Sequence, residues 1–121
     1  MYEPTGNPAM TRIDLNQDPT SVSADLRLEY AGRPFTGEAV EELAPGQLLS
    51  QEFYVDGIRH GSSREWWPDG RLKSEGEICR GRPHGVFRRW HPNGQLAETC
   101  LFDDDGQLEA VRAWDPAGRP R

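Results

Sequence analysis

The sequence is poor in the apolar residues from which a compact core is built. Only 35% of its 121 residues are hydrophobic, the mean hydropathy is −0.81, and no run of apolar residues approaches the roughly 18 that cross a membrane. This composition excludes a membrane-spanning helix and argues against an ordinary compact globule. The N-terminus also lacks an apolar run behind a basic segment, so we expect no signal peptide and a cytoplasmic location.

Cysteine is equally scarce, since Cys79 and Cys100 are the only two in the chain. We expect both thiols to be reduced, with a disulfide between them as the alternative, because two cysteines define no disulfide framework. The set Cys79, His84, His91 and Cys100 contains zinc-ligand types, but its spacings of five, seven and nine residues match no paired zinc knuckle. We therefore expect neither a metal site nor a cofactor.

Basic residues are outnumbered, with 14 Lys and Arg against 20 Asp and Glu and a net charge of −6. This balance argues against a dedicated nucleic-acid binder, because such proteins gain much of their affinity by neutralising phosphates. The charge is unevenly distributed: residues 1–56 and 90–121 are acidic, whereas residues 57–89 are basic. A basic stretch of this kind is usually a solvated sheet face, although it also suits an anionic patch on a partner.

Glycine and proline are abundant, at 13 and 10 residues, and they recur with a period of 24 residues. Several columns stay in phase without any insertion: Gly46, Gly70, Gly94 and Gly118; Trp66, Trp90 and Trp114; Pro68, Pro92 and Pro116; Leu48, Leu72 and Leu96. A period of about 20 to 50 residues is typical of supersecondary units that stack on one another. Such an array needs less core material than a globule, because each unit buries its apolar residues against its neighbours.

Each unit contains two turns and two strands. The triplets PDG (68–70), PNG (92–94) and PAG (116–118) place Pro and Gly as in a hairpin loop with a left-handed Gly, and DGIRHG (56–61) and RGRPHG (80–85) are predicted to be return loops. The runs between them are six to eight residues long, which suits strands and is too short for helices. We predict an all-β fold: a twisted antiparallel meander of stacked hairpins, with about seven or eight strands in a single elongated domain.

The repeat also sets the predicted boundaries. We place the repeat domain at residues 21–121, with units at 30–53, 54–77 and 78–101 and a partial unit at 102–121. Residues 1–20 are rich in Pro, Asn, Asp and Thr and are predicted to be a disordered tail, within which Met10 is an alternative start. The row of Trp and Leu residues is expected to form the core, and a ligand platform is the alternative interpretation.

Two stretches, GSSREWWPDGRLKSEGEI (61–78) and GVFRRWHPNGQLAETCLF (85–102), resemble the MORN repeat-variant family, which includes YwqK-like antitoxins. GEAVEELAPGQLLSQEFY (37–54) carries the resemblance more weakly, and the whole extends over about residues 30–121. The resemblance implies a twisted sheet of stacked hairpins with a binding role. In its bacterial branch, it implies the neutralisation of a partner toxin by an antitoxin or immunity protein.

The residues themselves show no catalytic constellation. His60 and His84 recur at the repeat period, which is unusual for a catalytic histidine and favours turn residues, and the sequence has no nucleophile motif or phosphate-binding loop. We therefore predict a protein that is not an enzyme and that binds another protein. The most specific form of this prediction is an antitoxin or immunity-type inhibitor of a basic toxin, with no nucleic acid as partner.

The residues predicted to contact this partner are mostly acidic, because opposite charges speed encounter and select partners. They are Glu38, Glu41, Glu42, Asp103, Asp104, Asp105, Arg64 and Arg88. The Gly and Trp columns are assigned to turns and core. Two alternatives stay open: a structural module that forms homodimers through its sheet edges, and a peripheral binder of anionic lipid through the basic middle of the chain.

Overall fold

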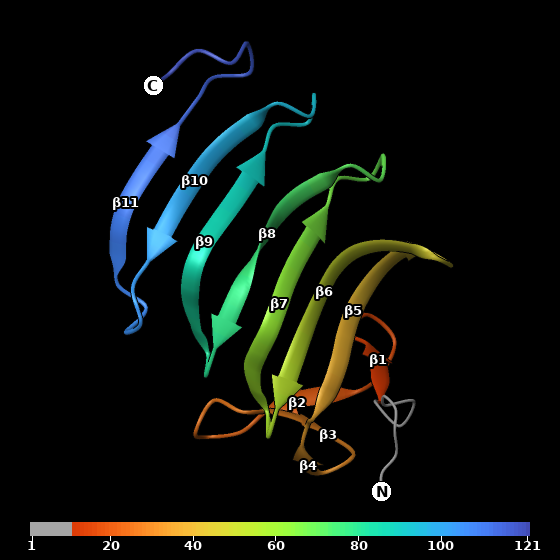
Figure 1. The fold of residues 1–121 in the computed structure, drawn as a ribbon. Coiled ribbons are helices and arrows are strands. Elements are labelled where there is room, and N and C mark those ends of the chain that lie inside the picture. The colour runs from red at the N-terminus through yellow and green to blue at the C-terminus, as the bar shows by residue number, and fades with distance from the viewer. Residues whose placement is uncertain (1–10) are drawn as a thin grey trace, which may run out of the picture.

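The computed structural model describes residues 11–121, which form two β-sheets and, within this range, contain no helix (Figure 1). The larger sheet has eight strands, and the smaller one has three. The long sheet contains, in spatial order, β1 (Arg12–Asp14), β5 (Gly37–Ala44), β6 (Gln47–Val55), β7 (Ile58–Trp66), β8 (Leu72–Cys79), β9 (Arg82–Trp90), β10 (Leu96–Phe102) and β11 (Leu108–Ala113). The small sheet contains β2 (Thr20–Val22), β3 (Leu28–Tyr30) and β4 (Arg33–Pro34). The predicted all-β fold class is confirmed.

Strands β5 to β11 form the predicted antiparallel meander, in which each strand pairs with the next one in the sequence. Figure 1 shows these strands side by side in the order of their colours, from yellow to blue. Short loops join them at the two long edges of the sheet. The long sheet is therefore built almost entirely from contacts between sequence neighbours.

The edge strand β1 departs from the prediction. Residues 1–20 are predicted to be disordered, but Arg12–Asp14 pair in parallel with β5, and Ile13 is only 2% exposed. Ile13 explains the difference, because burying this one apolar side chain stabilises a segment whose overall composition is that of a disordered tail. Residues 1–10, including Met10, lie outside the described residues.

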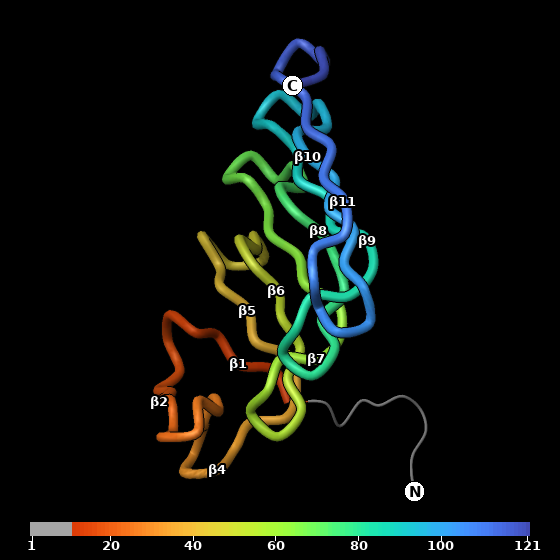
Figure 2. Tube along the Cα trace, turned by 90° about the vertical axis from the view of Figure 1, so that its left-hand side faces the viewer, coloured from red at the N-terminus to blue at the C-terminus, as the bar shows by residue number. Residues whose placement is uncertain are grey.

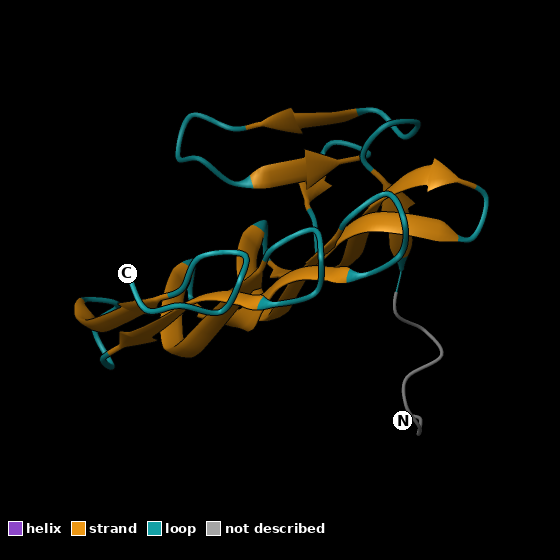
Figure 3. Ribbon diagram, turned by 90° about the horizontal axis from the view of Figure 1, so that it is seen from above, coloured by secondary structure: helices purple, strands orange, loops and turns teal. Residues whose placement is uncertain are grey.

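A parallel pair needs a long connection between its strands, and here that connection contains the small sheet. Figures 2 and 3 show the small sheet lying against one side of the long sheet at its N-terminal end. The core lies between these two layers, where Ile13, Phe35 and Ala39 are buried and the rings of Phe35 and Tyr54 pack 6.1 Å apart. Farther along, the same side of the long sheet is bare (Figure 3).

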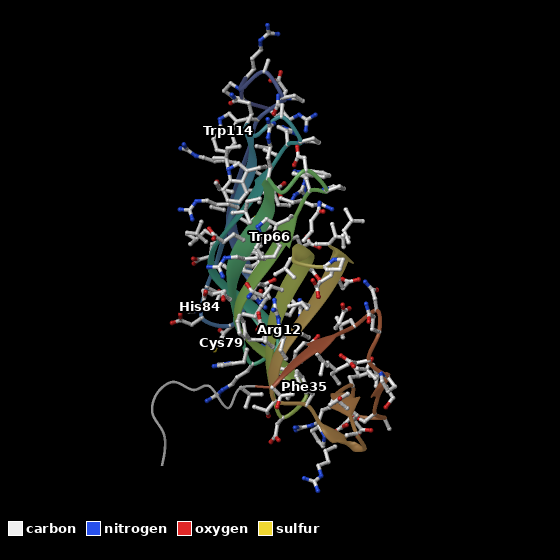
Figure 4. All side chains as sticks on the ribbon, turned by 90° about the vertical axis from the view of Figure 1, so that its right-hand side faces the viewer. Arg12, Phe35, Trp66, Cys79, His84 and Trp114 are labelled. Atoms are coloured by element: carbon white, nitrogen blue, oxygen red, sulfur yellow. The ribbon has the colours of Figure 1, made fainter. Side chains whose placement is uncertain are left out.

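The tryptophan column, predicted to form the core, lies outside it. Trp66, Trp90 and Trp114 are each half-buried, and Figure 4 shows Trp66 and Trp114 well separated along the long sheet. Trp66 pairs with Leu72 and Trp90 with Leu96 directly across a hairpin. Because no second layer covers this part of the sheet, a neighbouring strand shields each ring while the rest of the ring stays in contact with solvent.

The repeated hairpin loops share one hydrogen-bond pattern. The loops are residues 67–71, 91–95 and 115–119. In each, the N–H of the first residue donates to the carbonyl of the fifth, and the N–H of the fourth residue donates to the carbonyl of the first, at 2.8 to 2.9 Å. The fourth residue of each loop is a column glycine with a positive φ, a conformation that glycine adopts without steric strain. These residues are Gly70, Gly94 and Gly118, with φ values of 91°, 89° and 87°, while Gly46, with φ of 81°, lies in the shorter turn between β5 and β6.

The return loops are shorter than predicted. Residues 56–61 and 80–85 are predicted to be loops, but the turns occupy only residues 56–57 and 80–81, all four with positive φ. Two-residue turns of this kind match the twist of the flanking strands, so the strands pair up to the turn itself. β7 and β9 take up the remaining residues, and His60 therefore lies in a strand rather than in a loop.

The same five-residue loop pattern also occurs at residues 103–107 and 23–27, outside the Pro-x-Gly triplets. Gly106 takes the fourth place in the first of these loops, but Leu26 takes it in the second, with a φ of 64°. A residue with a Cβ loses about 1–2 kcal/mol in this left-handed conformation. Burial of the Leu26 side chain offsets little of this strain energy, because the residue is 81% exposed.

We expect Leu26→Gly to raise the free energy of unfolding by about 0.5–1 kcal/mol, because glycine removes the left-handed strain at a smaller entropic cost. The matched control is Gly94→Ala, which introduces the same strain into an equivalent loop and is expected to lower the free energy of unfolding by about 1 kcal/mol. Urea unfolding followed by tryptophan fluorescence measures both changes. A shift in the same direction for the two variants would contradict the equivalence of the loops.

Candidate functional site

Alternation along the strands divides the long sheet into two chemically different faces. Residues directly opposite each other on neighbouring strands point to the same side, so the register assigns each side chain to a face. The carboxylate face carries Glu41, Ser50, Glu52, Ser63, Glu65, Ser74, Phe87, Arg89, Glu98 and Cys100. The arginine face carries Glu38, Gln51, Arg64, Glu75, Glu77, Val86, Arg88, Thr99, Leu101, Ala110 and Arg112.

On the carboxylate face, serine hydroxyls of β6, β7 and β8 each donate to a glutamate on the preceding strand. The pairs are Ser50–Glu41 at 2.9 Å, Ser63–Glu52 at 2.7 Å and Ser74–Glu65 at 2.9 Å. Ser50 and Ser63 are only 7% and 8% exposed, so their hydroxyls need partners within the protein. We call these three pairs the Ser–Glu ladder. Each carboxylate in it is held in place and still has lone pairs for a further donor.

Glu52, in the Ser–Glu ladder, has a raised pKa. Burial raises the pKa of Glu52 above its ordinary value of 4.5, and the nearby charge of Glu65 also raises it. The Ser63 hydroxyl and the Arg59 guanidinium, 3.5 Å from the carboxylate, lower the pKa but do not offset the loss of hydration. A cation that approached Glu52 would replace part of this lost hydration.

A hollow of about 340 Å³ opens on the carboxylate face. Its lining includes members of the Ser–Glu ladder together with Phe87 and Phe102, whose rings meet edge to face at 5.6 Å. Gly76 makes room for Phe87, because a Cβ at this position would lie 2.5 Å from atoms of the ring. The hollow combines aromatic surface with carboxylates, of which Glu52 and Glu98 already pair with Arg59 and Arg89 in its lining. A long basic side chain with an apolar stem suits the aromatic surface and the Glu65 carboxylate.

On the arginine face, polar pairs link the N-terminal strands. Glu38 lies 3.4 Å from the Arg12 guanidinium and accepts a hydrogen bond from Gln51 at 2.6 Å. Arg64 pairs with Glu75 at 3.2 Å. These contacts connect β1 with β5, β5 with β6, and β7 with β8, and they engage two of the residues predicted from sequence to contact a partner, Glu38 and Arg64.

The structure does not gather the predicted contact residues into one surface. Glu41 lies on the carboxylate face, whereas Glu38, Arg64 and Arg88 lie on the arginine face. Glu42 accepts a hydrogen bond from the Gly46 N–H at 2.6 Å, so its carboxylate supports the turn between β5 and β6. These acids come from one short segment of sequence, but alternation separates them in space.

The acidic triplet lies far from those residues, in the loop between β10 and β11. Asp103 accepts hydrogen bonds from the amides of Asp105 and Gln107 at 2.9 and 2.8 Å, so it shapes the loop. The Asp104 side chain is exposed, with its carboxylate 3.7 Å from Nδ1 of His84. Asp104 and Asp105 are thus the members of the triplet that present charge to solvent.

The histidines and cysteines are engaged in local structure. His60 accepts the Arg80 N–H at 3.1 Å through Nδ1, and Nε2 of His91 lies 2.8 Å from the Trp114 carbonyl. Cys79 and Cys100 are free thiols in the structure. Burial raises the pKa of the Cys100 thiol, and the neighbouring Glu98 carboxylate raises it further, so this thiol is a weaker nucleophile than an ordinary one.

Sequence reasoning missed the Ser–Glu ladder, although a signal for it is present. Glu41 and Glu65 are 24 residues apart, as are Ser50 and Ser74, so both belong to polar columns of the repeat. Grouping acids by their distance along the chain includes Glu41 but not its partner in the column. The repeat period, which identifies the Gly and Trp columns, also identifies the Glu and Ser columns.

Residues 59–79 and 83–104 match the model of a family described as MORN repeat variant. The matched segments correspond to the hairpins β7–β8 and β9–β10. Over these two segments, the chain is similar to the MORN repeat-variant family. MORN repeats are a non-catalytic binding type, so the matches also indicate a repeat-type binding module. No curated protein matches the chain. Across residues 11–121, the structure has no helix with the length and hydrophobicity needed to cross a membrane.

We expect Gly76→Ala to lower the free energy of unfolding by about 1–3 kcal/mol, because the new Cβ overlaps the ring of Phe87. The double variant Gly76→Ala/Phe87→Ala should lose less stability than the sum of the two single changes, since removing the ring removes the overlap. Urea unfolding of the wild type and the three variants measures this coupling. Strictly additive losses would show that the ring does not pack on Gly76.

The raised pKa of Glu52 predicts a pH dependence of stability. Between the ordinary Glu pKa and the raised one, the folded protein holds a proton that the unfolded chain has lost, so stability falls as the pH rises through this window. Glu52→Gln removes that loss. We expect the stability of the variant relative to wild type to increase as the pH rises from the ordinary Glu pKa through the raised one, as measured by urea unfolding, and a difference that does not change with pH would contradict the raised pKa.

Proposed function

We propose that this chain is a non-enzymatic protein-binding module that holds a basic partner on its carboxylate face, and that in its most specific form it is a bacterial, cytoplasmic antitoxin or immunity-type protein. The observation that carries the proposal is the Ser–Glu ladder, which fixes three carboxylates on the side of the long sheet that the small sheet covers only at its N-terminal end. Acceptors that are already ordered lose little entropy when a cation binds them. The MORN matches support a binding role.

A protein partner suits this face better than a small molecule does. The hollow is broad and open, and the small sheet forms a step at one end against which a partner can pack (Figure 3). A Lys or Arg side chain entering beside Glu52 and Glu65 would lay its stem against Phe87. Toxins that act on nucleic acids are expected to have basic surfaces, which an acidic face would cover.

The second candidate is self-association through a sheet edge, and one observation favours it. β11 is six residues long, and in residues 11–121 its outer side is occupied only at its end, where the Ala113 carbonyl accepts the Arg121 N–H at 2.9 Å. Open backbone groups of this kind pair readily with another strand. The opposite edge is protected, because β1 has three residues and its Asp14 N–H donates to the Asp18 carboxylate at 2.8 Å.

The test is retention of a partner from an extract of the source cell, followed by binding kinetics with the purified partner. We expect a basic protein whose association rate falls at least about tenfold between 0.05 and 0.5 M salt, because exposed charges steer the encounter. Glu65→Lys on the carboxylate face should slow association by a comparable factor. For an antitoxin, expression of the partner alone should arrest growth, and co-expression of this chain should restore it.

The matched control is Glu77→Lys, which makes the same charge change at an exposed residue of the arginine face. Equal slowing by the two variants would show that total charge rather than the carboxylate face governs binding. A stable homodimer in sedimentation, dissociated by Val111→Pro on β11, with no basic partner retained, would replace the binding proposal with edge association.

A further inference from the structure

The arginine face carries a regular row of cations that the proposed function does not use. Arg64, Arg88 and Arg112 lie on β7, β9 and β11, and the register places them in one row that crosses the sheet. They are 24 residues apart, so the repeat itself generates the row. Because successive members are two strands apart, their spacing is about 9.6 Å.

Two members of the row are available to a ligand. Arg64 is neutralised by Glu75 at 3.2 Å. Arg88 and Arg112 are exposed, and among the ion pairs of residues 11–121 neither has a carboxylate within pairing distance. Thr99, which lies between them in the row, carries no charge. The C-terminal part of this face is therefore the part whose cations lack an internal partner.

Apolar surface lies directly beside these two arginines. Val86 and Leu101 pair across β9 and β10 and are 41% and 40% exposed. Together with Ala110 on β11, these two residues form a second row beside the row of arginines. A hollow of about 160 Å³ lies here, lined by both rows, and its lining includes Val86, Leu101 and Arg112. A ligand that fits must therefore combine negative charge with an apolar group.

We propose that Arg88, Arg112 and this hollow bind a short acidic segment of a partner protein, with two carboxylates on the arginines and an apolar side chain in the hollow. An extended chain in the polyproline II conformation has three residues per turn and advances about 9.3 Å per turn, so acidic residues three apart match the row. The residue next to each acid then faces the second row.

A polypeptide fits these observations better than a nucleic acid does. A phosphate backbone would use the cations but leave the apolar hollow empty, and the chain as a whole carries a net charge of −6, which repels a long polyanion. A short acidic segment uses both features. Because this site is on the opposite face from the Ser–Glu ladder, it goes beyond the proposed function: the sheet would hold a basic protein on one face and an acidic segment on the other.

The probe for the test is a fluorescein-labelled peptide of Glu-Pro-Leu triplets, and its binding is followed by fluorescence anisotropy at low salt. We expect Arg88→Gln/Arg112→Gln to weaken binding by about tenfold, since each exposed charge pair contributes a modest share. The matched control is Arg33→Gln/Arg119→Gln, which removes the same charge from exposed residues outside this face and should change the affinity by less than about twofold. A peptide with Ser in place of Leu should bind more weakly to wild type.

Three outcomes would overturn the proposal. One is equal weakening by the control pair, another is equal binding of the Ser-containing peptide, and the third is tighter binding of a single-stranded oligonucleotide that the same arginine variants abolish. Circular dichroism establishes whether Arg88→Gln/Arg112→Gln folds. If it does not fold, a charge swap is the test instead. The Arg88→Glu variant should no longer bind the original peptide but should bind a peptide in which Lys replaces the central Glu. Failure of this second peptide to bind would count against the site.

Discussion

Cross-strand pairing is the interaction on which this protein depends, because most of the long sheet has no second layer to pack against (Figure 3). Beyond the core around Phe35, each strand is held by its backbone ladder and by side chains that reach the next strand. The hairpin loops are linked in the same way: Arg71 donates to the Pro92 carbonyl at 3.1 Å, and Asn93 donates to the Pro116 carbonyl at 2.8 Å. Individual cross-strand pairs contribute about 0.2–1 kcal/mol, and repetition adds them into a stable array.

The repeat length explains why the two faces differ in charge. Each 24-residue unit is one hairpin of two strands, so a residue that recurs in each unit returns to the same face two strands later. Arg64, Arg88 and Arg112 therefore align on one face, while Glu41 and Glu65 align on the other. The two faces therefore differ through two polar columns of opposite sign, although the acidic column continues as Arg89 in the third unit.

Much of the fold was predictable from sequence, because turn chemistry and period are local properties. The column glycines mark the hairpin loops, and the runs between them have the length of strands. Residues 11–36 were not predictable, since they lie outside the clear repeat and their structure depends on a few apolar contacts such as those of Ile13. The assignment of residues to the two faces of the sheet was harder to predict. Register shifts, such as the one between Glu65 and Trp66, decide the face on which a residue lies. Residues close together in the sequence, such as Glu38 and Glu41, lie on opposite faces.

The position of the two-layered core at one end of the array has a consequence for biosynthesis. The segment from Ile13 to Tyr54, which contains the core, leaves the ribosome before the later hairpins, so the packed end can form first. Each later hairpin then pairs with the strand that precedes it in the sequence, so its folding does not depend on the synthesis of a distant segment. The chain can thus fold by vectorial addition as it is synthesised: the newest strand is the growing edge at each stage, and β11 is the last to be added.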